Sequence, residues 1–290
     1  MTNNKILLVG ANGYIGSRFL DREGNKFNTT NIDNLEKPGT LSKNIEKKDY
    51  KDLDKKYLNN FDICLWLAGH SSVPMSIKDP YGCYSNNLSG LVEFSEKFEG
   101  LLVYASSASV YTNTSGALSS EDSIIGIPRN IYDYTKVAFD DYMRIMNKKY
   151  VSLRFGTVNG GSRGIREDLL LNSMVKAALL DKEVKLGNPK ASRGVLYIED
   201  LIDALVLILN NPPTESQIFN LSSINGNMEN FANMVAHKLN VKIKRLPDSP
   251  TYNFQLDNSK FSNTYNYKFT TDMEIIADNL IKFYTATYNL

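Results

Sequence analysis

A glycine cluster behind a short apolar run constrains the fold more than any other feature of the sequence. The run "KILLV" ends at Val9, and "GANGYIG" follows with three glycines in seven residues. Glycine costs backbone entropy, so such a cluster needs a structural reason. A strand, a glycine-rich turn and a helix begin the βαβ unit that binds dinucleotides. In that unit Gly10 permits a tight turn, Gly13 lets backbone approach a pyrophosphate, and Gly16 lets the helix pack closely on the strand. The spacing is G-x-x-G-x-x-G, which plain turns also show, so the motif alone leaves that alternative open.

Strand-like and helix-like segments alternate along the first half of the chain. Apolar runs typical of buried strands lie at 5–10, 28–33, 62–69, 100–107 and 150–156. Helical spacing of apolar residues lies between them, at 14–24, 53–61, 87–98 and 131–149. This alternation predicts the α/β class with a doubly wound parallel sheet of the Rossmann type.

The pattern loosens after residue 156. Helices are predicted around 169–180 and 199–211, and strands at 193–198 and 218–222. We expect residues 1–160 to form the dinucleotide-binding domain, with later strands from about 191–222 completing its sheet. Residues 161–190 and 223–290 are expected to form a small C-terminal substrate-binding lobe.

Composition argues against several classes of function. The 290 residues carry a net charge of +1 with interspersed signs, which does not favour nucleic-acid binding. No apolar stretch approaches the ~18 residues of a membrane span, and the N-terminal run is too short for a signal peptide. We therefore expect a cytoplasmic protein without a membrane partner. Two histidines and two cysteines, Cys64 and Cys83, without Cys-x-x-Cys spacing predict free thiols and no metal site.

Asp33 ends the second predicted strand, about twenty residues after the glycine cluster. A carboxylate at this place binds the adenosine ribose hydroxyls and repels a 2′-phosphate. No arginine follows in "DNLEKPG", so the sequence favours NAD over NADP. The alternative is an aspartate that starts a turn before Asn34.

Two later stretches carry side chains suited to proton transfer. "YASSASVY" (104–111) places hydroxyls after a buried strand, at the end where open α/β sheets bind ligands. "YDYTK" places Tyr132 and Lys136 four residues apart, on one face of a predicted helix. An ammonium group and the positive nicotinamide of oxidised NAD both favour the phenolate, which brings a phenol with an ordinary pKa of ~10 nearer to a general base. A tyrosine and a lysine at this spacing also occur by chance. Chance is a poor explanation here, because the pair follows the glycine cluster and the serine-rich strand end in the chain.

In this order the motifs resemble those of the extended short-chain dehydrogenase/reductase family, specifically its NAD-dependent nucleotide-sugar epimerases and dehydratases. The stretches that carry the resemblance are "GANGYIG", "NIDNL", "LAGHSSVPMSIKDPYGCYSNNLSG", "YASSASVYTN", "YDYTK", "LRFGTVNGG" and "SRGVLYIEDLIDAL". They follow one another over most of the chain.

The resemblance implies a role for each matching residue. Ser107 becomes the catalytic serine, Tyr132 the general base, and Lys136 the group that lowers the pKa of that tyrosine and contacts the nicotinamide ribose. The implied NAD-binding residues are Gly10, Asn12, Gly13, Tyr14, Ile15, Gly16, Asp33, Asn34, Asp49, Tyr50, Leu67, Ala68, Gly69, Asn87, Tyr132 and Lys136. The implied substrate-binding residues are Ser107, Ala108, Ser109, Asn172 and Arg193.

Some of these assignments leave alternatives. Asp52 competes with Asp49 for the adenine contact, and Arg193 is otherwise a solvated loop residue. His70 and Ser71 lie in a loop expected near the cofactor, where a plain loop role is equally open.

Two departures from the family pattern bear on the activity. Dehydratases of the family place an Asp-Glu pair directly after the catalytic hydroxyl, whereas this chain has Ala108 and Ser109. Neither residue is a carboxylic acid, so we expect epimerisation of a nucleotide sugar, at C4 through a transient 4-keto intermediate, and not dehydration. Thr112 stands where the family has glycine. This departure affects the local turn expected there and not the chemistry. The chain is also shorter than typical epimerases, and the shortfall falls on substrate loops.

Two other functions use the same residues. A 4-keto reductase or 4-dehydrogenase would exchange hydride with cofactor from solution, and a non-catalytic nucleotide-binding protein could use the same fold. Neither the sugar nor the nucleotide base follows from the sequence.

The helices predicted at 87–98 and 131–148 carry apolar residues on more than one face. In relatives the corresponding pair forms a two-fold dimer, so we expect a homodimer. The alternative is burial of these helices between the sheet and the lobe.

Overall fold

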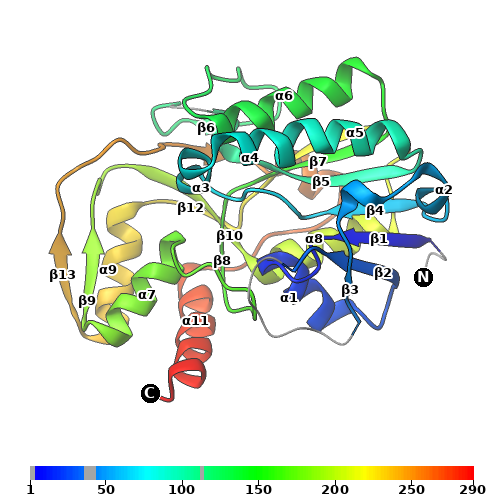
Figure 1. The fold of residues 1–290 in the computed structure, drawn as a ribbon. Coiled ribbons are helices and arrows are strands. Elements are labelled where there is room, and N and C mark those ends of the chain that lie inside the picture. The colour runs from blue at the N-terminus through cyan, green and yellow to red at the C-terminus, as the bar shows by residue number, and fades with distance from the viewer. Residues whose placement is uncertain (1–3, 36–43, 112–113) are drawn as a thin grey trace.

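A seven-stranded parallel sheet forms the centre of the computed structural model, which describes residues 4–35, 44–111 and 114–290. The strand order is β11–β7–β5–β4–β1–β2–β3 (Figure 1). The strands are β1 Lys5–Val9, β2 Asn28–Asp33, β3 Glu46–Lys47, β4 Ile63–Trp66, β5 Leu101–Ser107, β7 Tyr150–Phe155 and β11 Gln217–Leu221. The predicted fold class is confirmed. Thr112 lies outside the described residues.

Helices cover both faces of this sheet. In Figure 1, α3 (Val73–Lys78), α4 (Pro80–Tyr84), α5 (Gly90–Lys97) and α6 (Ile131–Ile145) lie above it, and α1 (Tyr14–Glu23) and α8 (Ile198–Asn210) lie below. Short helical segments are η1 Tyr50–Asp52, α2 Lys55–Leu58, η2 Ser85–Ser89 and η3 Ala108–Tyr111.

Strand β1 shows why a continuous apolar run suits this position. Side chains alternate between the two faces of a strand. Ile6 and Leu8 pack into one core cluster, and Leu7 and Val9 into the other. All four are buried because helices cover both faces.

The direction of winding reverses at β1. From β1 the chain passes to β2 and β3 on one side, and then to β4, β5, β7 and β11 on the other. Such a reversal leaves a crevice at the carboxyl ends of the central strands, where α/β proteins bind ligands.

A second group of elements lies beside the central sheet and extends from the middle of Figure 1 to its left and bottom. Its strands are β8 Thr157–Asn159, β9 Glu183–Leu186, β10 Ser192–Tyr197, β12 Ile224–Asn227 and β13 Lys242–Arg245. Its helices are α7 Leu170–Leu180, α9 Met228–Leu239 and α11 Met273–Tyr288. The remaining elements are β6 Leu118–Ser119, β14 Gln255–Leu256 and α10 Ser259–Tyr265.

The strand predicted at 193–198 does not complete the central sheet. It forms β10, which pairs with β8 and β12 in a separate three-stranded sheet, whereas β11 does join the central one. Gly156 separates β7 from β8, and a Cβ at this position would lie 2.7 Å from the carbonyl oxygen of Gly194. This close approach of two backbones lets the chain leave the central sheet and pair with β10 instead.

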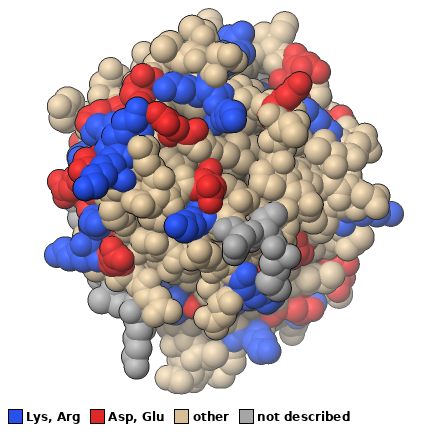
Figure 2. All heavy atoms as spheres, turned by 90° about the vertical axis from the view of Figure 1, so that its right-hand side faces the viewer, with Lys and Arg blue, Asp and Glu red and all other residues tan. Residues whose placement is uncertain are grey.

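On the face drawn in Figure 2, lysine and arginine side chains lie interspersed with aspartate and glutamate. No helix within the described parts of the chain is long and apolar enough to cross a bilayer.

Candidate active site

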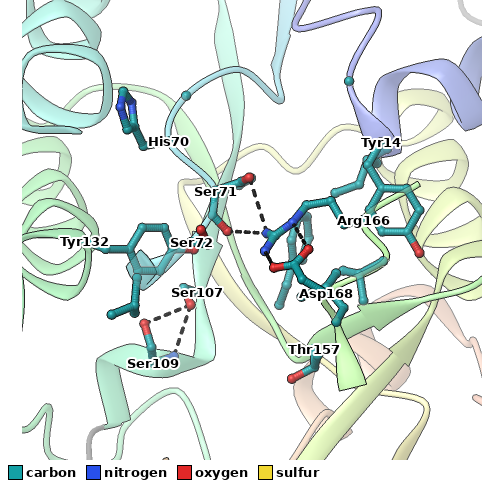
Figure 3. A pocket seen from close by; sticks show the side chains of 18 of the residues that line it. Tyr14, His70, Ser71, Ser72, Ser107, Ser109, Tyr132, Thr157, Arg166 and Asp168 are labelled. Atoms are coloured by element: carbon teal, nitrogen blue, oxygen red, sulfur yellow. Dashed lines mark hydrogen bonds and ion pairs between the residues drawn. The ribbon is translucent and has the colours of Figure 1, made fainter. Parts of the chain in front are cut away.

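A cavity of about 910 Å³ lies where the winding of the sheet reverses (Figure 3). The glycine turn after β1, the loop after β4, the end of β5 and the start of α6 form one side. The loop after β8, strand β10 and residues 250–254 form the other. The predicted site residues that line it are Asn12, Gly13, Tyr14, Ile15, Leu67, Ala68, Gly69, Ser107, Ser109, Tyr132, Lys136 and Arg193.

The glycine turn packs backbone against backbone. Gly10 has a φ of +87°, and a Cβ there would lie 2.6 Å from the amide nitrogen of Ala68. A Cβ on Gly16 would lie 2.3 Å from the carbonyl oxygen of Gly10. Helix α1 begins at Tyr14 and has no side-chain cap. Its first N–H groups are therefore available to an anion, and the residues present fit the pyrophosphate of a dinucleotide.

Gly16→Ala is expected to weaken NAD binding by at least about tenfold, because the added methyl group pushes α1 away from the turn. Calorimetric titration of NAD, after removal of any bound nucleotide, measures this effect. Gly187→Ala is the matched control, since the nearest atom to its new methyl group lies 3.6 Å away. Equal NAD affinity of Gly16→Ala and wild type would contradict this role of the turn.

Asp33 ties the end of β2 to the glycine turn. One carboxylate oxygen accepts the N–H of Asn12 (2.9 Å) and the other accepts that of Leu35 (2.8 Å). Each oxygen retains a further acceptor position, which suits ribose hydroxyls. Asn34 follows it and is exposed.

Asp49 and Tyr50 do not line the cavity. The carboxylate of Asp49 accepts the N–H of Lys51, and so begins the short helix η1. The ring of Tyr50 packs on Trp66, with the ring centroids 4.7 Å apart, and its hydroxyl donates to Asn86. Both side chains thus contact neighbouring protein residues, and the adenine contact expected for Asp49 stays a prediction.

Asn87 holds the backbone of His70, in the loop after β4, by two hydrogen bonds. Its side-chain oxygen accepts the N–H of His70 (2.8 Å), and its amide donates to the carbonyl of the same residue (2.9 Å). Gly69 precedes this clamp with a φ of +128°, and a Cβ there would lie 2.4 Å from the Asn87 oxygen. Asn87 therefore fixes the loop after β4, and its side chain does not itself line the cavity.

Ser107, Tyr132 and Lys136 meet at the wall of the cavity. Ser107 ends β5, and its hydroxyl hydrogen-bonds Ser109 (2.9 Å) and faces Tyr132. Lys136 donates to the carbonyl of Ala105 (2.7 Å), and its ammonium lies 5.6 Å from the centroid of the Tyr132 ring. The two residues of the "YDYTK" motif thus share one face of α6, as their spacing predicts.

Burial dominates the electrostatics of this group. It raises the pKa of Tyr132 above its ordinary value, while the Ser107 hydrogen bond and the Arg166 charge lower that pKa. Burial also lowers the pKa of Lys136 to about 8. The phenol therefore needs further positive charge before it can act as a base at neutral pH.

Sequence reasoning missed two cations that line the cavity, Arg163 and Arg166, both in the loop between β8 and α7. Arg163 forms an ion pair with Asp21. Arg166 donates to the carbonyl of Ser71 (2.6 Å) and forms an ion pair with Asp168 (Figure 3). Thr157 also lines the cavity. The only available signal was the charged run "SRGIRED" before a predicted helix, and such runs are usually solvated loops.

Arg193 projects from β10 at the other side of the cavity. Its guanidinium lies 5.9 Å and 5.5 Å from the ring centroids of Tyr252 and Phe254 and donates to Thr251. Burial lowers its pKa to about 10, which leaves it charged at neutral pH. Among the described residues no carboxylate forms an ion pair with it. A half-buried cation of this kind is suited to an anionic ligand.

Two predicted substrate contacts are corrected by the structure. Asn172 is fully buried, its oxygen accepts the N–H of Gly160 (3.0 Å), and its amide donates to the carbonyl of Arg166 (2.9 Å). It holds the loop after β8 and does not line the cavity. Ala108 is fully buried in an apolar cluster with Val110 and Phe254 and also lies outside the cavity lining.

Cys64 and Cys83 are buried free thiols, as expected. Within the residues that the structure describes, no three His, Cys, Asp or Glu side chains gather as a metal site.

A glycine turn at a helix start, an acidic residue at the end of the next strand and a Ser–Tyr–Lys group at one cavity define a class: dinucleotide-dependent α/β enzymes. The model of the NAD dependent epimerase/dehydratase family matches residues 6–222, and the chain belongs to that family. Membership confirms the resemblance inferred from the motifs, the expectation of an enzyme, and NAD as the cofactor.

Named relatives lie within the same group. The chain is 29% identical to a UDP-glucose 4-epimerase of Lactobacillus helveticus, over 77% of each protein. It is 24% identical to a UDP-glucuronate 4-epimerase of Arabidopsis thaliana, over 99% of this chain and 77% of that protein. Its fold is similar to that of UDP-glucuronic acid 4-epimerase from Bacillus cereus, solved with UDP-glucuronic acid and NAD. That similarity has a TM-score of 0.85 at 23% identity and covers 98% of this chain and 100% of the other.

Proposed function

We propose that the protein is an NAD-dependent nucleotide-sugar epimerase that inverts C4 through a transient 4-keto sugar. One observation carries this proposal: the Ser107–Tyr132–Lys136 group lines the same cavity as Arg193, a cation with no carboxylate partner among the described residues. Proton transfer and anion binding are thereby available to one ligand. The 4-epimerase names of the relatives support the reaction type.

Different residues of this chain would bind the cofactor and the substrate. The N–H groups of Tyr14 and Ile15 at the start of α1 would hold the pyrophosphate of NAD, and the carboxylate of Asp33 would bind its ribose hydroxyls. NAD, when bound, supplies reversible acceptance of hydride and a positive charge near the phenol. Arg193 would hold the diphosphate of the nucleotide sugar.

Tyr132 acts first as a base and then as an acid. Its phenolate takes the proton of the sugar 4-hydroxyl, and the Ser107 hydroxyl hydrogen-bonds the same sugar oxygen. With the diphosphate held at Arg193, the 4-keto sugar turns its other face to the cofactor. The phenol then returns the proton to the 4-oxygen. Ala108 and Ser109 offer no carboxyl group for the elimination of water.

Deuterium at C4 of UDP-glucose and UDP-glucuronate tests the proposal. Without added cofactor, the C4 epimer should form and retain deuterium at the inverted carbon, which NMR detects. A reaction that needs added NAD or NADH and transfers the deuterium into solution cofactor would instead indicate the 4-keto reductase or 4-dehydrogenase alternative.

Arg193→Met is expected to raise KM for the nucleotide sugar by about tenfold or more with little change in kcat, because a charged hydrogen bond is lost from ground state and transition state alike. Arg144→Met is the matched control, since Arg144 pairs with Asp141 on exposed α6 surface. A kcat decrease at constant KM would contradict an anchoring role for Arg193.

The homodimer is also a proposal, and exposed apolar side chains on the outer helices support it. Ile77 is 69% exposed on α3, Tyr81 is 80% exposed on α4, and Ile145 is 73% exposed on α6. Light scattering should give twice the mass of the 32.7 kDa chain. Tyr81→Glu should shift the protein toward the monomer, and a monomeric wild type would contradict this proposal.

We also place the protein in the cytoplasm, since its two free thiols are typical of a reducing compartment.

A further inference from the structure

The carboxylate of Asp133 is buried directly after the proposed general base. Its side chain is fully inaccessible, and its partners are neutral donors. The hydroxyl of Tyr252 lies 2.8 Å from its nearer oxygen, and the amide of Asn130 also lies 2.8 Å away. A buried carboxylate requires such hydrogen bonds, so these contacts hold the first turn of α6 to residue 252.

Tyr252 contacts the anion-binding end of the cavity as well. Its ring lies under the guanidinium of Arg193, and its neighbour Thr251 accepts a hydrogen bond from the same group (2.5 Å). Residues 250–252 and 254 line the cavity. One side chain therefore touches both the cation that would bind the diphosphate and the turn of α6 that carries Tyr132.

We propose that Tyr252 is a positioning residue: its ring holds Arg193, and its hydroxyl, through Asp133, sets the place of Tyr132 relative to that anchor. The inference rests on the proposed function and deepens it. The separation between the diphosphate anchor and the phenol decides which sugar hydroxyl reaches the phenol. Binding of the diphosphate at Arg193 then makes the first turn of α6 more rigid.

The helix cap does not need the Tyr252 hydroxyl. Asn130 caps α6 by itself, because its side-chain oxygen accepts the N–H of Asp133 (2.9 Å). Removing the hydroxyl should leave the helix start in place while it releases α6 from the segment that holds Arg193. Positioning and simple capping are therefore separable by experiment.

The test is Tyr252→Phe in the full chain, which keeps the ring under the Arg193 guanidinium and removes only the hydroxyl. UDP, GDP and dTDP are titrated by calorimetry into wild type, and the tightest binder is used as the probe. Hydrogen exchange of the peptide over 130–138 is then followed by mass spectrometry with and without this nucleotide. Tyr142→Phe is the matched control, because it removes a hydroxyl bonded to a carboxylate, Glu96, near the other end of α6.

In wild type and Tyr142→Phe, the nucleotide should slow exchange at 130–138 several-fold. Tyr252→Phe should bind it with the same affinity, within about twofold, and show no such slowing. Tyr252→Leu, which also removes the ring, should bind it about tenfold more weakly. With a sugar nucleotide that wild type converts, Tyr252→Phe should lower kcat about tenfold with KM unchanged, since a small misplacement of reacting groups has effects of this size.

Equal slowing of exchange in Tyr252→Phe and wild type would overturn this inference alone and leave the proposed function standing. Wild type that binds none of the three nucleotides would overturn the proposed function together with this inference.

Discussion

Tyr132→Phe should lower turnover by about 10²–10⁴-fold, the contribution typical of a positioned general acid or base. The substitution removes only the phenolic oxygen, and the ring can remain beside the Lys136 ammonium 5.6 Å from its centroid. Because the glycine turn and Asp33 are untouched, bound NAD per chain should stay at the wild-type value. Turnover and released NAD are measured on the same preparation.

Tyr134→Phe is the matched control for this experiment. Tyr134 lies on the same helix, is 45% exposed and does not line the cavity. It should turn over at the wild-type rate. Near-normal turnover of Tyr132→Phe would refute the assignment of the base.

The second large effect concerns a buried ion pair behind the active site. The side chains of Asp140 and Arg154 are 3% and 2% exposed. The Nε atom of Arg154 lies 3.1 Å from the Oδ2 atom of Asp140. The Asp140 carboxylate also accepts the hydroxyls of Tyr104 (2.8 Å) and Ser152 (2.7 Å). Arg154→Met should lower the free energy of unfolding by about 3–5 kcal/mol, because it leaves a buried charge without its counter-ion.

Denaturant unfolding measures this loss. The double variant Asp140→Leu/Arg154→Met should recover part of it, since no unpaired charge remains. Arg144→Met, which breaks the exposed pair with Asp141 on the same helix, should cost less than about 1 kcal/mol. A loss of similar size in the two single arginine variants would contradict the special role of burial.

The elements predicted correctly share one property: their pattern is local. Strand β1 is recognisable because both of its faces are buried, which makes it a continuous apolar run. Strand β8 was missed because it has three residues, too few to show a period. Strand β10 was recognised, but its partners were not, because its pairing depends on the close approach of the backbones at Gly156 and Gly194 and not on the pattern of β10 alone.

The site follows the same rule. The Tyr132–Lys136 spacing is local and places both residues at the cavity. Arg166 and Tyr252 reach it from loops that lie outside every quoted motif, so only the fold shows that they line the cavity. Asn172 was misassigned because its type suits a diphosphate contact, whereas the structure uses its amide to hold Gly160 and the loop that follows.

The measurement that tests the central claim most directly is the identification by mass spectrometry of the small molecules released when the purified protein is denatured. An epimerase keeps its cofactor through turnover, so NAD or NADH should appear at close to one per chain, and any nucleotide sugar released with it would name the substrate class. Protein that releases neither and binds no added NAD would contradict the account.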